Sequence, residues 1–151
     1  MRGREFIVVA DWLASLDSEA SLRSQTSRLY YAVYLEARSW CEEHLGYVRI
    51  RSAREHACIP SLLRDVDAEV AASLVFMRDL RNTADYDMDL SPDTIALQCL
   101  DAQRRAKRIL GRLDELAAPG TDARPRPIPL RPRMRHTAPS DAGDICPRVA
   151  L

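Results

Sequence analysis

The chain has 151 residues, of which 46% are hydrophobic, and this length is enough to bury the core of a single domain. Basic and acidic side chains number 22 each, so the overall charge gives no reason to expect a general affinity for polyanions. No apolar stretch is long enough to predict a secretion signal or a membrane span, so the expected location is the cytoplasm.

The sequence predicts neither a metal nor a cofactor. The cysteines lie far apart and the histidines are isolated: Cys41, Cys58, Cys99 and Cys146, and His44, His56 and His136. A zinc site needs clustered ligands, and a nucleotide cofactor commonly needs a glycine-rich phosphate loop, which is not found. The spacing of the cysteines does not indicate a disulfide framework, which agrees with a reducing compartment.

The first predicted helix covers residues 5–16 and is short. Helical spacing places four apolar side chains on its expected inner face: Phe6, Val9, Leu13 and Leu16. A long second helix is predicted over residues 21–45, because its apolar positions keep a helical period. Asp17 and Ser18 precede it as N-cap candidates, and Gly46 provides the expected stop.

The middle of the second helix carries three tyrosines within five positions, Tyr30, Tyr31 and Tyr34. They cannot share one helix face, so they serve either aromatic core packing or a cleft toward a neighbouring helix. After this helix, residues 47–64 predict an irregular loop, because Pro60 is expected to break any helix. Three arginines in the loop either meet phosphate or are simply solvated: Arg49, Arg51 and Arg54.

A third helical pattern runs over residues 65–86. Five side chains share one face at steps of four and three: Val70, Leu74, Met77, Arg81 and Ala84. An arginine on an apolar stripe is unfavourable unless a carboxylate or a bound anion neutralises it. Asp85 follows four residues later, the spacing at which helical side chains meet. The segment is therefore either a helix-end ion pair or part of a site.

The last predicted helix begins at Ser91, with Pro92 at its first position and Asp93 in its first turn. Apolar residues then repeat at four-three steps: Ile95, Cys99, Ala102, Ala106, Ile109, Leu113 and Leu116. Residues 119–151 contain seven of the nine prolines and carry a net charge of +3, against −3 for residues 1–118. The expected organisation is an all-α bundle over residues 1–118 and a disordered Pro/Arg-rich tail over 119–151.

Two segments together resemble a known family. S-R-L-Y-Y-A-V-Y at residues 27–34 resembles the S-R-x-Y-Y-A-x-F helix of small prokaryotic HEPN-domain proteins. L-R-N-T-A-D-Y-D at residues 80–87 resembles the L-R-x-x-A-D-Y ending of one branch of that family. The order of the segments, their separation by about fifty residues and the all-helical setting agree with it. The resemblance covers about residues 5–117.

This resemblance implies a four- to five-helix up-and-down bundle that forms a homodimer, with each arginine motif lining a cleft on the two-fold axis. Many family members are metal-independent endoribonucleases, often toxins beside a nucleotidyltransferase antitoxin or effectors of phage defence. Their signature is R-x4-6-H, commonly with a polar residue after the arginine. Arg81 and Asn82 match its first two positions, but no histidine lies between His56 and His136.

Metal-independent RNA cleavage requires a base for the 2′-hydroxyl proton, an acid for the leaving oxygen and a cation for the phosphorane charge. Arg81 fits the cation, Asp85 is a candidate base and Tyr86 a candidate acid or positioning group. The resulting site prediction has two parts: catalytic Arg81, Asn82, Asp85 and Tyr86, and substrate-binding Ser27, Arg28 and Tyr31.

Two functions remain open at this point. The first is an RNA-directed protein, an endoribonuclease or an RNA binder, with RNA and a nucleotidyltransferase-type antitoxin or a defence protein as partners. The second is a non-catalytic dimeric helical scaffold whose polar motif holds an interface together. The missing histidine favours the scaffold, and the clustering of polar residues around Arg81 favours the RNA-directed protein.

Overall fold

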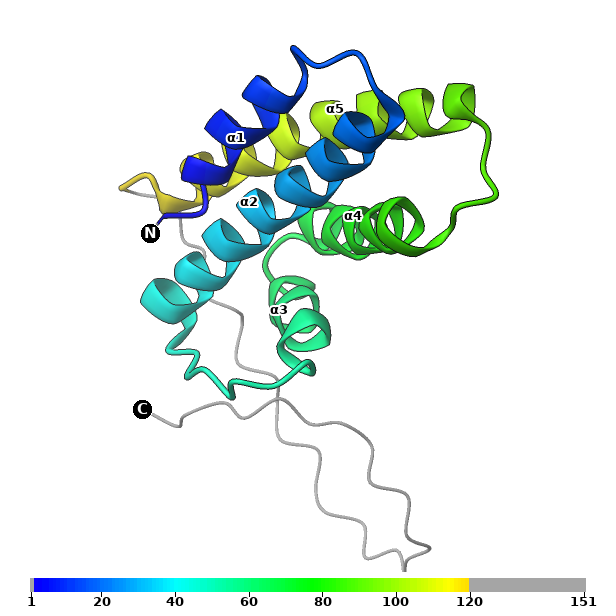
Figure 1. The fold of residues 1–151 in the computed structure, drawn as a ribbon. Coiled ribbons are helices and arrows are strands. Elements are labelled where there is room, and N and C mark those ends of the chain that lie inside the picture. Colours follow the sequence, from blue (N-terminus) through cyan, green and yellow to red (C-terminus); the bar gives the residue numbers. More distant parts are fainter. Residues whose placement is uncertain (1, 120–151) are drawn as a thin grey trace, which may run out of the picture.

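The computed structural model describes residues 2–119, and in this range the chain is all-helical and contains no strand. Figure 1 shows five helices: α1 (Glu5–Leu13), α2 (Glu19–Leu45), α3 (Glu55–Leu63), α4 (Ala68–Tyr86) and α5 (Pro92–Ala117). The predicted all-α bundle is confirmed. The predicted disordered tail, apart from Pro119, lies outside the described residues.

The second helix is the centre of the bundle, since α2 packs against each of the other four helices. It begins at Glu19 and not at the predicted residue 21, whereas the predicted N-cap candidate Ser18 and the predicted stop at Gly46 are confirmed. The Ser18 side chain accepts a hydrogen bond from the Ser21 backbone N–H at 3.1 Å. At the other end Gly46 adopts the left-handed conformation, with φ of 63°, which glycine allows without steric cost. Figure 1 shows α5 running beside α2, with α1 near both.

The predicted inner faces of the next two long helices are also confirmed. In α4 all four apolar members of the predicted stripe are buried: Val70, Leu74, Met77 and Ala84. Asp67 caps the start of α4 by accepting from two backbone N–H groups. In α5 the whole predicted seam is buried: Ile95, Cys99, Ala102, Ala106, Ile109, Leu113 and Leu116.

The prediction that Pro60 excludes a helix from residues 47–64 is wrong, because Pro60 lies inside α3. Proline in a helix interior costs about 3 kcal/mol. Its neighbours Ile59, Leu62 and Leu63 are nevertheless at most 4% exposed. Burial of three large apolar side chains contributes roughly 1.5–3 kcal/mol each, which outweighs that cost. Packing therefore overrides the local preference, and α3 forms.

The first helix is shorter than predicted, ends before Leu16 and presents a different side to the core. Val9 and Leu16 were expected to face inward but are 43% and 42% exposed, whereas Ala10 is fully buried. The chain passes very close to α2 just before α1: a Cβ added to Gly3 would lie 2.5 Å from the Ala32 carbonyl oxygen. Only glycine can therefore occupy this position without a shift of the neighbouring backbone.

Among residues 2–119, no helix combines the length and the apolar character that crossing a bilayer requires.

Candidate functional site

The side chain of Arg81 lies near the end of α4, at the border between core and solvent, with 21% of it exposed. Its Nη2 donates to the hydroxyl of Tyr31 at 2.9 Å, and its Nη1 donates to Oδ1 of Asn82 at 2.9 Å. Its Nε lies 2.9 Å from Oδ2 of Asp85, an ion pair whose direction is not that of a hydrogen bond. The ion pair between Arg81 and Asp85, one of the two alternatives that the sequence left open, is therefore present.

Two aromatic rings also contact this guanidinium. The ring centres of Tyr31 and Tyr86 lie 5.5 and 5.7 Å from the guanidinium carbon of Arg81. A cation near the face of an aromatic ring is stabilised by the electrons of that face. The Arg81 side chain is therefore held by a carboxylate, a phenol, an amide and two rings before any ligand binds.

A histidine that is isolated in the sequence lies close to Arg81 in the structure. His56, in the first turn of α3, faces the tyrosines of α2: its Nδ1 is 2.5 Å from the hydroxyl of Tyr30, and its ring stacks on Tyr34 at 4.3 Å. Together with Arg81, His56 borders an open pocket of about 280 Å³. Six residues line this pocket: Tyr30, Ala53, His56, Arg78, Arg81 and Asn82.

The electrostatics of the pocket keep His56 neutral. Partial burial lowers the pKa of the imidazole below its usual 6.5, and the positive charges of Arg81 and Arg78 lower it further. Glu55 acts in the opposite direction but does not reverse the shift. Burial also raises the pKa of the Tyr30 phenol well above 10, so the phenol stays protonated. At neutral pH the pocket therefore holds two guanidinium charges and a neutral imidazole.

The other predicted site residues are connected to Arg81 by contacts but lie outside this pocket. Asp85 and Tyr86 contact Arg81 but do not line the pocket. Ser27 is only 3% exposed, and its hydroxyl lies 3.4 Å from Asp85, so it positions the carboxylate from the core side. Arg28 lies over the ring of Tyr31, 5.3 Å from its centre. Of the predicted site residues, only Arg81 and Asn82 line the pocket.

Three lining residues, His56, Tyr30 and Arg78, are not among the site residues predicted from the sequence. No local spacing connects His56 with Arg81, because they lie on different helices and meet only when α3 docks. The loop arginines form no part of the pocket: Arg49, Arg51 and Arg54 are exposed, and only Ala53 of that loop lines it.

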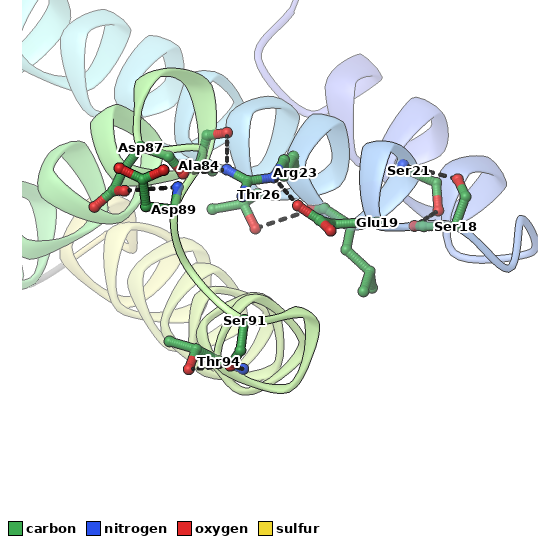
Figure 2. A network of polar contacts seen from close by, with 11 residues as sticks. Ser18, Glu19, Ser21, Arg23, Thr26, Ala84, Asp87, Asp89, Ser91 and Thr94 are labelled. Carbon is green, nitrogen blue, oxygen red and sulfur yellow. Dashed lines mark hydrogen bonds and ion pairs between the residues drawn. The ribbon is translucent and has the colours of Figure 1, made fainter.

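A second arginine fixes the end of α4 that carries the motif. Arg23 of α2 is only 7% exposed. Its Nη1 donates to the carbonyl oxygens of Ala84 at 3.0 Å and Asp87 at 2.7 Å, and its Nε donates to Glu19 at 2.7 Å. Figure 2 shows this guanidinium between Glu19 and the end of α4. The last carbonyls of a helix have no partner within the helix and carry partial negative charge, so a cation stabilises them.

Comparisons of the chain with known proteins found no matching family model, curated protein or solved structure.

Replacing Arg23 with Met should lower the free energy of unfolding by about 2–3 kcal/mol, because buried carbonyls lose charged hydrogen-bond donors. Urea denaturation measures the change. Arg104→Met is the matched control, since Arg104 is exposed on α5 and should change stability by less than about 0.5 kcal/mol. Equal losses in the two variants would contradict the assigned role of Arg23.

The lowered pKa of His56 predicts a specific dependence of stability on pH. As the pH falls below about 6.5, the unfolded chain takes up a proton on His56 before the folded chain does. Wild-type protein should therefore lose stability toward pH 5, and His56→Gln should lose less. Thermal denaturation at pH 7.5 and pH 5 measures both melting temperatures. A difference between the two proteins that does not change with pH would show that His56 titrates alike in both states.

Proposed function

We propose that the chain is a HEPN-like, RNA-directed protein, a metal-independent endoribonuclease that acts in a toxin–antitoxin or phage-defence setting. The observation that carries the proposal is the shared pocket of Arg81 and His56. It provides a cation and a neutral imidazole together, and these are groups that RNA cleavage without a metal requires. His56 supplies the imidazole from α3 in place of a histidine within the arginine motif.

The charge of the pocket favours an anionic ligand. Its six lining residues include two arginines and no carboxylate. Nε of Arg78 lies 3.8 Å from Oδ1 of Asp79, and the side chain of Asp79 is 63% exposed. A partly exposed ion pair of this kind contributes little to stability, so Asp79 competes only weakly with a phosphate for Arg78.

Arg81 keeps donors available for that phosphate. A guanidinium has five N–H groups, two on each Nη and one on Nε. Tyr31 and Asn82 each accept one of the Nη hydrogens, and Asp85 lies beside Nε. These two bonds leave one further N–H on each Nη, and a guanidinium can bind two phosphate oxygens at once through such groups.

The proposed reaction begins at the 2′-hydroxyl of the RNA. Neutral His56 accepts the hydroxyl proton, the 2′-oxygen forms a bond to phosphorus, and Arg81 balances the added charge of the phosphorane. The bond from phosphorus to the 5′-oxygen then breaks, and that oxygen takes a proton from the imidazolium or from water. The products are a 2′,3′-cyclic phosphate and a 5′-hydroxyl.

The contact with Tyr30 determines which nitrogen of the His56 imidazole accepts the 2′-hydroxyl proton. The Tyr30 hydroxyl contacts Nδ1 of His56, which leaves Nε2 as the nitrogen that can meet a ligand. When Nδ1 carries the hydrogen and donates it to the Tyr30 oxygen, the lone pair on Nε2 is free to accept a proton. Tyr30 is thus a positioning residue for His56.

Wild-type protein should cleave a single-stranded RNA oligonucleotide in the presence of a chelator and leave the all-2′-deoxy oligonucleotide intact. Arg81→Ala and His56→Gln should each reduce the cleavage rate by about 100-fold or more, through loss of charge stabilisation and of proton transfer. Gel assays and detection of the cyclic phosphate measure this.

His44→Gln is the matched control, because His44 lies at the end of α2 and stacks on Trp40 instead. It should cleave at the wild-type rate. If the wild type binds RNA without cleaving it, the function is RNA binding alone. If it neither binds nor cleaves RNA, the RNA-directed function is wrong. A toxin role further predicts that the wild type slows growth when expressed alone, and that a nucleotidyltransferase-type partner relieves this.

The second candidate function is a non-catalytic dimeric scaffold, and the outer face of α1 favours it. Val8 and Trp12 lie one helical turn apart and are 71% and 63% exposed. Exposed apolar side chains grouped on one face are typical of interaction surfaces. A homodimer is compatible with both functions.

The homodimer predicts a mass of twice 17.1 kDa by light scattering at micromolar concentration. Introducing Val8→Asp together with Trp12→Asp should shift the protein to a monomer if α1 supplies the interface, because charges are unfavourable in an apolar contact. Both side chains are largely exposed, so the fold should be retained, as helicity will show. A monomeric wild type would contradict the dimer.

A further inference from the structure

Aromatic rings and arginines form a continuous line that leads across three helices to the pocket. The guanidinium of Arg28 lies 5.5 Å from the ring centre of Phe6 on α1 and 5.3 Å from that of Tyr31 on α2. Beyond Tyr31 the line continues through Arg81 on α4 to the ring of Tyr86. Three rings and two cations therefore form a series in which each contacts the next, and we call them the aromatic–arginine line.

This line is accessible at its ends. Tyr86 is 72% exposed, and Phe6, Arg28 and Tyr31 are partly exposed. The phenol of Tyr31 is already bonded to Arg81, whereas most of the Tyr86 side chain is open to solvent. A ring offers a flat apolar surface to a nucleobase, and an arginine offers charge to the phosphate between bases. The bases and the phosphates of a single-stranded nucleic acid can therefore both be bound by this line.

We propose that the aromatic–arginine line is a binding track for unpaired RNA, which restricts the substrate of the site to single-stranded segments; this inference rests on the proposed function. In an A-form duplex the bases are stacked on one another and paired, so their faces cannot lie on protein rings. Unpaired bases can turn outward and stack on Tyr86 and Phe6, while their phosphates meet Arg28 and Arg81.

Acidic residues set the direction of the track. In the sequence Asp85 precedes Tyr86, and Asp87 and Asp89 follow it. Asp87 and Asp89 are both exposed. These carboxylates repel phosphate but not an uncharged base, so Tyr86 binds a base at the end of the track. The backbone passes instead toward Arg28 and Phe6, away from the acids.

The test compares binding of one RNA sequence as a single strand and as a duplex with its complement, using His56→Gln protein to prevent cleavage. Fluorescence anisotropy at fixed salt gives the dissociation constants. The single strand should bind at least about 10-fold tighter. Phe6→Leu and Tyr86→Leu, each added to His56→Gln, should weaken single-strand binding by about 5- to 150-fold, the range typical for loss of one base–aromatic stack.

The matched control is Phe76→Leu, which removes an aromatic ring that also contacts an arginine but lies outside the aromatic–arginine line. The ring centre of Phe76 lies 4.0 Å from the guanidinium carbon of Arg105 on α5. This variant should bind the single strand like the parent. Tyr86→Phe should also bind normally, since stacking needs the ring and not the hydroxyl.

Equal binding of single strand and duplex, or losses in Phe6→Leu and Tyr86→Leu no larger than in Phe76→Leu, would overturn the track while leaving the RNA-directed function intact. Loss of binding in Tyr86→Phe would likewise overturn it, because the hydroxyl would then be the recognised group. Absence of binding to either RNA would instead refute the proposed function.

Discussion

The position of the arginine motif depends on how the last turn of α4 is held. A helix end leaves its final carbonyl groups without partners inside the helix, and burying them unpaired is costly. Arg23 removes this cost by donating to the carbonyls of Ala84 and Asp87, while Glu19 offsets its charge. Since Arg23 belongs to α2, the end of α4 is fixed against the helix that also carries Tyr31. The contact between Arg81 and Tyr31 follows from this arrangement.

Arg81 is thereby placed where a cation is neither fully solvated nor fully buried. Loss of water disfavours its charge, and the hydrogen bond to Tyr31, the pair with Asp85 and the ring of Tyr86 compensate for that loss. Asp85 is itself 26% exposed, so its attraction to Arg81 is screened and contributes little net stability. The arrangement orients the guanidinium without neutralising it completely, and a cation of this kind is suited to an anionic ligand.

Most of the fold could be predicted from the sequence, because the buried faces of α4 and α5 follow a helical period and their caps are local signals. Pairing of Arg81 with Asp85 was predictable for the same reason. The remaining features depend on packing between distant segments. Nothing around Pro60 indicates that burial of its neighbours sustains α3, and without α3 there is no reason to place His56 beside Arg81. The close approach of Gly3 to α2 is equally invisible in the sequence.

The environment of His56 links the charge of the pocket to the chemistry proposed for it. In the free protein, burial and the nearby arginines lower the pKa of the imidazole, so it is neutral and able to accept a proton. A phosphate bound by Arg81 would bring negative charge beside the same ring and raise its pKa. The bound imidazole is then a stronger base, and the imidazolium formed by proton transfer is stabilised by the phosphorane charge. Binding and proton transfer therefore reinforce each other, which requires that His56 and Arg81 share one pocket.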